Sequence, residues 1–249
     1  MTKKKRPLDK LLVEKGLAPA EEQARPLIMA GKVIVDDHMV DKPGTPVSPH
    51  AHIRLRDMPG AYVGRGGQKL EKPLDLFTIT LTDKTVIDVG ASTGGFTDCL
   101  LQRGASRVFA VDVGYGQLAW KLQQDERVVN LERTNIRQLS PNRLQPPPHL
   151  AVVDVSFISV KKILPHLIAL LRPDGEILSL IKPQFEAKRQ AVERGGIVSD
   201  KKQYQKIIQD IAQTAMGLSL HLIGVTESPV PGHKGNREFF LYAKKTAKG

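Results

Sequence analysis

Two charged residues of opposite sign interrupt apolar stretches of this 249-residue chain. Residues 150–157 and 176–183 read as buried parallel strands, and Asp154 and Lys182 lie at their carboxyl ends, the edge at which open α/β sheets bind ligands. A buried charge is costly unless it is paired. Two such residues on strands that should be neighbours favour a functional site over unrelated structural charges. Taken alone, the lysine at 69 and the glutamate at 238 read as surface charges.

A glycine-rich turn forms the second candidate site. Residues 85–97 pass from a β-branched apolar run to glycines and small polar residues and then to a helical pattern, as expected for a strand, a tight turn and a helix. Ser92 stands where a dinucleotide fingerprint has its second glycine after Gly90. Asp88 and Asp112, at the ends of the first two strands, suit S-adenosylmethionine, which has a ribose and no phosphate. A tight connection without a ligand is the alternative.

The candidate cofactor-binding residues come from this turn, from the second strand end and from the loop after the third strand, which borders the adenine side of such pockets. They are Asp88, Gly90, Ala91, Ser92, Thr93, Gly94, Gly95, Phe96, Asp112, Asn135 and Ile136. The single cysteine, Cys99, lies on a stretch that should face the core, which argues against a cysteine nucleophile. No cysteine and histidine spacing resembles a zinc site, so we expect no bound metal.

The order of the elements predicts the sheet that must position these residues. From residue 85 onward strand and helix patterns alternate, which is typical of a parallel sheet covered on both faces. No helical pattern separates the last two strands, so the seventh strand should return antiparallel to the sixth. The expected fold class is α/β, with a seven-strand sheet that resembles that of the Rossmann-like methyltransferases. Its strands are expected at residues 85–89, 107–112, 128–131, 150–157, 176–183, 219–226 and 238–244.

Residues 1–58 read as a separate small α+β domain. Two short helical patterns, each ending at a glycine, are followed by short strand patterns, an order that resembles RNA-binding domains of the ribosomal protein S-four kind. Pro26 predicts that the second helix starts late or is kinked, because proline has no backbone N–H and clashes with the preceding turn. Residues 59–66 are expected to form a linker, and residues 67–249 the second domain.

The net charge of +11 favours a polyanionic partner through phosphate contacts and electrostatic steering. The two glycines after Arg65, expected just ahead of a helix, suit either backbone contacts to a phosphate or a hinge. No apolar stretch is long enough for a membrane span or a signal peptide, so we expect a cytoplasmic protein. The candidate RNA-binding residues, each equally well a solvated surface charge, are Lys4, Lys5, Arg6, Arg25, Lys32 and Arg65.

Three motifs together make the chain similar to the TlyA, or haemolysin A, family. They are Arg65-Gly66-Gly67-x-Lys69-Leu70, residues 88–97 and residues 154–159, and the likeness covers essentially the whole chain. The resemblance implies an amino-terminal S-four-type RNA-binding domain and an FtsJ-like ribose methyltransferase domain. It also implies S-adenosylmethionine as cofactor and 2′-O-methylation of ribosomal RNA, with cytidines of the ribosomal subunits as targets. The family's Lys-Asp-Lys-Glu tetrad falls on Lys69, Asp154, Lys182 and Glu238.

Several questions stay open at this point. Lys182 is the candidate nearest the target hydroxyl, either as a general base if Lys69 favours its neutral form or as an orienting cation if Asp154 keeps it charged. An RNA-binding assembly factor with a relic cofactor site would explain everything except the tetrad. A membrane-active cytolysin, which only the family's older name suggests, lacks an insertion segment. The modified subunit and the oligomeric state are undetermined.

Overall fold

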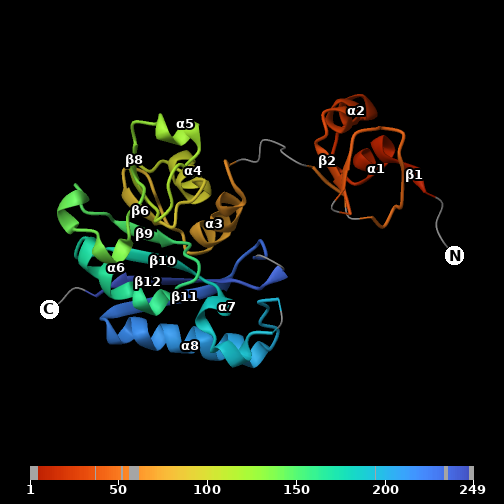
Figure 1. Ribbon diagram of the computed structural model, residues 1–249. Helices are drawn as coiled ribbons and strands as arrows, with labels where there is room; N and C mark the ends of the chain where they lie inside the picture. The colour runs from red at the N-terminus through yellow and green to blue at the C-terminus, as the bar shows by residue number, and fades with distance from the viewer. Residues whose placement is uncertain are drawn as a thin grey trace. The chain divides into compact units, whose positions relative to one another are not determined.

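The computed structural model describes residues 5–36, 38–51, 53–55, 62–193, 195–232 and 235–246. The chain divides into two compact units, Met1–Gly60 and Ala61–Gly249. Each unit has a hydrophobic core of its own (Figure 1).

The larger unit is built on one seven-strand sheet that is buried on both faces. Its central strands are apolar apart from Thr85, Asp88 and Arg107, which is typical of parallel strands covered by helices on either side. The strands are β6 (Thr85–Val89), β7 (Arg107–Val111), β8 (Val128–Leu131), β9 (Leu150–Val153), β10 (Glu176–Ile181), β11 (Leu220–Glu227) and β12 (Phe239–Lys245).

The strands lie in the order β11-β12-β10-β9-β6-β7-β8. Strands β6 to β10 run parallel, whereas β12 is antiparallel to both of its neighbours, β10 and β11. The predicted fold class is therefore confirmed, as is the antiparallel pairing of the last two strands. The carboxyl ends of the five parallel strands meet at one edge, and the amino end of β12 reaches the same edge.

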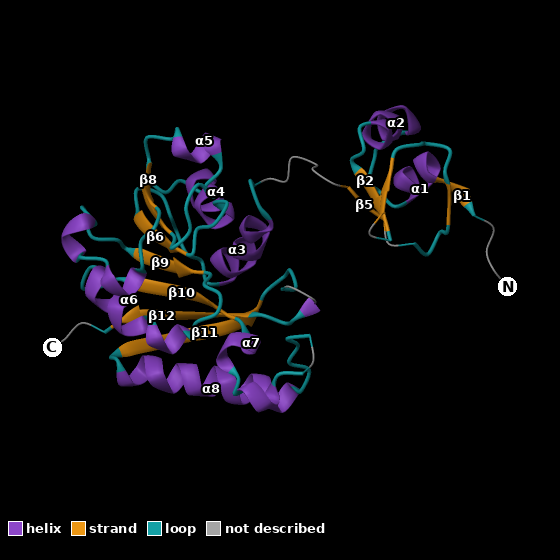
Figure 2. Cartoon of the chain, in the orientation of Figure 1, coloured by secondary structure: helices purple, strands orange, loops and turns teal. Residues whose placement is uncertain are grey.

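Helices cover the two faces of this sheet. The helices α6 and α8 share one core cluster with residues such as Ile87 and Leu241, and α3 and α4 share the other with residues such as Val86 and Phe240 (Figure 2). The α-helices are α3 (Arg65–Leu76), α4 (Gly95–Gln102), α5 (Trp120–Gln123), α6 (Leu164–Leu170), α7 (Pro183–Glu186) and α8 (Lys201–Gly217). The short 3-10 helices are η1 (Ile136–Gln138), η2 (Pro141–Arg143), η3 (Val160–Lys162) and η4 (Arg189–Ala191).

The amino-terminal unit packs two helices on short strands. Its elements are β1 (Arg6–Pro7), α1 (Leu8–Glu14), α2 (Glu21–Met29), β2 (Val33–Val35), β3 (His38–Val40), β4 (Pro46–Val47) and β5 (Ile53–Leu55). Strands β3, β2 and β5 form a three-stranded sheet in that order, and β1 pairs with β4. Pro26 lies inside α2, and the N–H of Ala30 donates to its carbonyl at 2.9 Å. The expectation of a late helix start is therefore wrong, because α2 already begins at Glu21.

Of the element boundaries that differ from the sequence expectation, three bear on the candidate site. The helix α3 begins at Arg65, so the two glycines lie in its first turn and not ahead of it. Strand β9 ends at Val153, and the chain turns after Asp154, with Phe157 at a φ of 63°. Strand β10 ends at Ile181 because Pro183 opens α7, the position at which proline is best tolerated in a helix.

Candidate active site

The glycine-rich turn connects β6 to α4 and brings the first two parallel strand ends together. Gly90 has a φ of 87°, and a Cβ atom there would lie 2.4 Å from the carbonyl oxygen of Asp154. Only glycine fits this close approach. The N–H groups of Gly90 and Ala91 both donate to the carbonyl of Val111. The turn is thus fixed against β7 on one side and against the end of β9 on the other.

The Arg65-Gly66-Gly67 motif packs against this turn. A Cβ on Gly95, the first residue of α4, would lie 3.0 Å from the backbone nitrogen of Gly67 and 3.1 Å from the Cα of Gly66. The absence of side chains therefore lets α3 approach the amino end of α4. Close helix packing accounts for these glycines, and neither a hinge nor a phosphate contact is needed to explain them.

A pocket of about 500 Å³ opens at the carboxyl edge beside the turn. This volume lies in the range of small-molecule and cofactor sites. A second cavity of about 130 Å³ adjoins it, and both are lined by Gly90, Ser92 and Asp154. The other predicted cofactor residues on the larger pocket are Asp112, Asn135 and Ile136, and those on the smaller one are Ala91, Thr93, Gly95 and Phe96.

Asp88 lies beneath the turn and is fully buried. Its Oδ2 accepts a hydrogen bond from the Thr97 hydroxyl at 2.7 Å, whereas its Oδ1 has no hydrogen-bond partner among the described residues. Burial raises the pKa of Asp88 to about 7. The hydrogen bond from Thr97 lowers this pKa, whereas the nearby charges of Asp154 and Asp112 raise it further. A buried acceptor without a partner marks a place where a ligand or water can donate.

Asp112 follows β7 and holds the pocket wall. Its Oδ2 accepts from the N–H of Ser92 at 2.8 Å and its Oδ1 from the N–H of Gly114 at 2.7 Å. A carboxylate oxygen has two acceptor sites, so both can still bind ribose hydroxyls. Asn135, which also lines this pocket, accepts from the N–H of Arg137 at 3.1 Å through its side chain and caps η1, which begins with the buried Ile136.

The first of two ion pairs lies where β9 and β10 end. The Nζ atom of Lys182 is 2.5 Å from Oδ1 of Asp154, and the exposed fractions of the two side chains are 12 % and 20 %. Lys182 also donates to the hydroxyl of Ser156 at 3.0 Å. Because Asp154 and Ser156 both line the larger pocket, this ammonium group is held at its rim.

The second ion pair joins α3 to the start of β12. The Nζ atom of Lys69 is 2.7 Å from Oε2 of Glu238, and their side chains are 11 % and 2 % exposed. A Cβ on Gly232 would lie 2.1 Å from Oε1 of the same glutamate, so the loop before β12 packs closely over the pair. These residues are remote in sequence, and the fold brings their charges together in a nearly dry environment.

The two ion pairs are connected through the sheet. Ile181 of β10 pairs with Phe239 of β12 in an antiparallel ladder, so Lys182 and Glu238 occupy the next position along it. Residues directly opposed in such a ladder have Cβ atoms about 4.5–5.5 Å apart. The structure therefore brings all four expected tetrad residues to one edge of the sheet as two lysine–carboxylate pairs, and Asp154 of these four lines the pocket.

Comparison with known protein families agrees with this geometry. The family model described as FtsJ-like methyltransferase matches residues 62–245, and the S4 domain model matches residues 6–53. The chain belongs to the FtsJ-like methyltransferase family. It carries an S4 domain ahead of the methyltransferase domain, so the resemblance deduced from the sequence motifs is confirmed.

Several relatives match the FtsJ-like chain over nearly its whole length. YqxC of Bacillus subtilis, whose name proposes an rRNA methyltransferase, is 47% identical over 97% of this chain and 86% of its own. The 16S/23S rRNA (cytidine-2′-O)-methyltransferase TlyA of Mycobacterium tuberculosis is 44% identical over 95% of this chain and 89% of its own. A solved structure from Streptococcus thermophilus, titled as a haemolysin, has a TM-score of 0.76 at 40% identity and covers 99% of this chain and 90% of that one.

Four side-chain contacts at the FtsJ-like site were not predicted from the sequence. Ser156 contacts Lys182, and Phe157 is 90 % exposed with its ring 4.9 Å from that of Phe185. The carboxylate of Glu186 accepts from the Ser159 hydroxyl at 2.6 Å and from the N–H of Val160 at 2.7 Å. Glu186 therefore ties the segment after β9 to α7, directly beyond Lys182. The motif over residues 154–159 was the available signal, but it does not reveal these partners.

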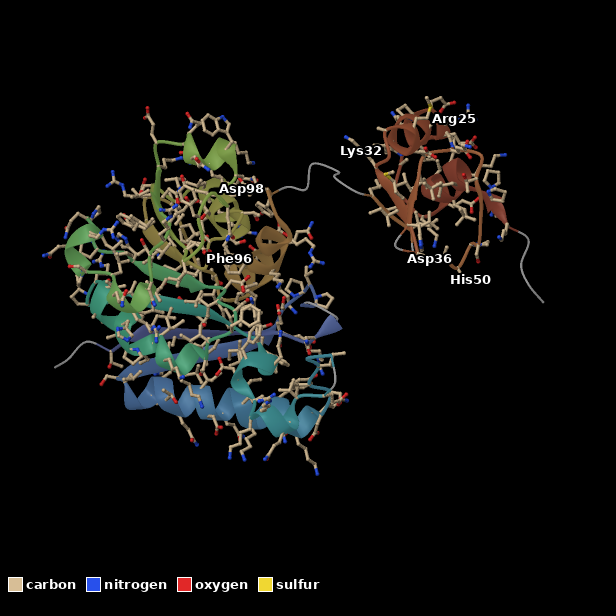
Figure 3. The ribbon with its side chains drawn as sticks, in the orientation of Figure 1. Arg25, Lys32, Asp36, His50, Phe96 and Asp98 are labelled. Atoms are coloured by element: carbon tan, nitrogen blue, oxygen red, sulfur yellow. The ribbon has the colours of Figure 1, made fainter. Side chains whose placement is uncertain are left out.

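The predicted RNA-binding residues have different surroundings. Lys4 lies outside the described residues, and Lys5 and Arg65 are exposed. Arg6 forms an ion pair with Glu14, and Arg25 pairs with Asp9 at 3.1 Å and Glu21 at 3.6 Å. Figure 3 shows Arg25 and Lys32 toward one end of the S4 domain and Asp36 and His50 toward the other. Because Arg6 and Arg25 remain about half exposed, their ion pairs leave room for a phosphate contact.

Two further expectations concern groups outside the pocket of the FtsJ-like domain. Cys99 is completely buried in α4, and burial raises the pKa of its thiol to about 11, which leaves it a poor nucleophile. Figure 3 locates this helix by its labelled residues Phe96 and Asp98, which precede Cys99 in the sequence. Within the described ranges, no group of three or more histidine, cysteine or acidic side chains is arranged to hold a metal ion.

Proposed function

We propose that the protein transfers a methyl group from S-adenosylmethionine to the ribose 2′-hydroxyl of ribosomal RNA, with cytidine as the target nucleoside. The observation that carries this proposal is the two lysine–carboxylate contacts at this edge of the sheet, of which the Lys182–Asp154 contact borders the larger pocket. A reacting hydroxyl needs charged groups that fix its position and stabilise negative charge as its proton leaves. Two ammonium groups at one sheet edge, each held by a carboxylate, supply that environment.

The pocket fits S-adenosylmethionine in size and in the groups it offers. Asp112 would bind the ribose hydroxyls, Ile136 and Asn135 would border the adenine, and the turn over residues 90–96 would lie along the remainder. The Oδ1 atom of Asp88, which has no hydrogen-bond partner in the described part of the chain, is a buried acceptor below this turn. When bound, S-adenosylmethionine would supply an electrophilic methyl group. Because Gly90 has no Cβ atom, the turn can lie close to the backbone of Asp154.

Lys182 is the residue we assign to the target hydroxyl. Its Nζ forms an ion pair with Asp154 at 2.5 Å, a geometry that supports an orienting cation over a general base. In this role Lys182 donates to the 2′-oxygen and stabilises the alkoxide character that develops as the hydroxyl proton passes to solvent water. Asp154 and Ser156 hold the ammonium in place, so alignment of the hydroxyl accounts for much of the rate.

Lys69 and Glu238 are assigned a positioning and electrostatic role in the same tetrad. Glu238 is almost inaccessible to solvent and binds Lys69 through a charge-assisted contact of 2.7 Å. Because Glu238 and Lys182 directly follow the last pair of the ladder, Ile181–Phe239, the negative charge of Glu238 also acts on the orienting ammonium of Lys182.

Ribosomal RNA is the proposed substrate, and ribosomal subunits are the proposed partners. The S4 domain, the net charge of +11 and the 2′-O-methyltransferase name of the M. tuberculosis relative all support this choice. Such a substrate would place the protein in the cytoplasm. A cytolysin has less support, since the helices of the described residues include none long and apolar enough to cross a membrane.

Turnover separates the proposed enzyme from an RNA-binding assembly factor. Purified protein is incubated with methyl-labelled S-adenosylmethionine and with 30S or 50S subunits that lack the modification. We expect label in the RNA of at least one subunit, and calorimetry should show binding of S-adenosylmethionine but not of NAD. Binding of cofactor and subunits without any transfer of label would support the assembly factor instead.

A further inference from the structure

The segment after β7, which runs into α5, leaves three large apolar side chains in solvent. Val113, Tyr115 and Trp120 are 72 %, 69 % and 72 % exposed. Single exposed apolar residues are ordinary on protein surfaces, but three within eight residues make this segment a candidate interaction site. We call these three residues and Arg133 the Trp120 surface.

The fold holds this segment firmly from below. Leu118 and Leu122, on either side of Trp120, are only 4 % and 3 % exposed and belong to the core around α4. The N–H of Ala119 donates to the carbonyl of Thr93 in the glycine-rich turn at 3.1 Å. Trp120 is therefore exposed on a segment whose neighbouring residues are packed into the core, and this packing fixes the outward position of its side chain.

A cation is already stacked on this surface. The guanidinium carbon of Arg133 lies 4.0 Å from the ring centroid of Tyr115, and the N–H of Arg133 donates to the carbonyl of Gly114 at 2.9 Å. Arg133 is held at a φ of 51°, a conformation that L-residues rarely adopt. Beneath it, the N–H of Gln117 donates to the carboxylate of Glu132 at 3.2 Å. The stacked pair is thus preformed by several backbone contacts.

The Trp120 surface continues outward from the proposed cofactor site. Val113 lines the larger pocket next to Asp112, and residues 134–137, which directly follow Arg133, line it as well. RNA whose ribose reaches Lys182 must therefore lie close to this rim. Exposed aromatic rings and arginine planes are the groups on which proteins stack unpaired bases.

We propose that the Trp120 surface stacks unpaired RNA bases that flank the methylated nucleotide. This inference rests on the proposed RNA substrate. The Arg133–Tyr115 stack, the positive charge of the chain and the continuity with the pocket favour RNA over an apolar protein partner. The surface would select substrates in which the target lies in an unpaired segment, because paired bases present no free ring faces.

Trp120 is the only tryptophan in the chain, so its fluorescence reports on this surface directly. Full-length protein with S-adenosylmethionine is titrated with a single-stranded oligoribonucleotide of about 12 nucleotides, within the site sizes of single-strand-binding domains. The same sequence is then tested as a duplex. We expect saturable quenching and reduced access of acrylamide to Trp120 with the single strand, and much weaker effects with the duplex.

Variants of the Trp120 surface test whether these residues contribute to the affinity for single-stranded RNA. Tyr115→Ala and Trp120→Ala should each weaken binding of labelled single-stranded RNA roughly tenfold, as removal of a stacking platform does. Arg133→Ala should act in the same direction. Trp120→Phe should retain most of the affinity. Met216→Ala, which removes another exposed apolar side chain on α8, is the matched control and should bind as wild type.

The outcomes separate this inference from the proposed function. Unchanged RNA affinity in both Tyr115→Ala and Trp120→Ala would overturn the Trp120 surface, even if the wild type methylates ribosomal RNA. Protection of Trp120 by whole subunits but not by free RNA would also overturn it and would indicate a ribosomal protein partner. The variants' affinity for S-adenosylmethionine should stay at the wild-type value, which shows that their pocket is intact.

Discussion

The two lysine–carboxylate pairs at the sheet edge differ in how far solvent reaches them. Glu238 is 2 % exposed in its pair with Lys69, whereas Asp154 is 20 % exposed in its pair with Lys182. The more buried pair joins a helix to a strand, and the more open pair faces the pocket. From this difference we infer that the Lys69–Glu238 pair stabilises the folded site, whereas the Lys182–Asp154 pair contacts the substrate hydroxyl.

The largest effect is expected for Lys182→Ala. Loss of the ammonium beside the target hydroxyl should lower the rate of methyl transfer by about 10²–10³-fold, as removal of a preorganised donor does in other enzymes. The affinity for S-adenosylmethionine, measured by calorimetry, should remain at the wild-type value. Asp88→Ala is the contrasting variant and should weaken cofactor binding. Wild-type turnover by Lys182→Ala would remove Lys182 from the mechanism.

The buried pair should matter most for stability. Glu238→Ala leaves the ammonium of Lys69 without its partner in a nearly dry site, so we expect the free energy of unfolding to fall by about 3 kcal/mol. Urea denaturation measures this change. Asp75→Ala, which breaks an ion pair whose carboxylate is 66 % exposed, is the control and should cost less than about 1 kcal/mol. Similar losses for both variants would contradict the division between the two pairs.

The parts of this site differ in how well the sequence predicts them. Strand ends and the glycine-rich turn follow from hydrophobic runs and local turn chemistry, so the positions of Asp88, Asp112 and Asp154 could be predicted. Lys69 and Glu238 gave no such signal, because their pairing joins segments 169 positions apart, and only the family resemblance pointed to them. The same holds for Glu186, whose contacts with Ser159 and Val160 depend on how α7 packs against the segment after β9.

Removal of residues 1–60 should leave both ion pairs intact and act on RNA binding alone. The larger unit has its own core, so the affinity for S-adenosylmethionine should not change. The affinity for ribosomal RNA should fall at least about tenfold, because two linked binding modules gain avidity from each other. Filter binding with ribosomal RNA measures this loss. Equal affinities of the truncated and full-length chains would show that the S4 domain does not contribute.

A third carboxylate, Asp88, should make stability depend on pH. Its pKa is raised to about 7 by burial, so between its ordinary value and 7 the folded chain holds a proton that the unfolded chain releases. The contribution of Asp88 to stability is therefore present in acid and is lost as the pH rises toward 7. Asp88→Asn should decline less in stability than the wild type between about pH 5 and pH 8 in urea denaturation. Parallel pH profiles would contradict a buried, protonated Asp88.

The position of the transferred methyl group tests the central claim most directly. Subunits lacking the modification are treated with methyl-labelled S-adenosylmethionine and the wild-type chain, and the RNA is then hydrolysed in alkali and digested to nucleosides. The account predicts one alkali-resistant linkage, which is the mark of a blocked 2′-hydroxyl, and 2′-O-methylcytidine as the labelled nucleoside. Label on a base, with every linkage open to alkali, would contradict it.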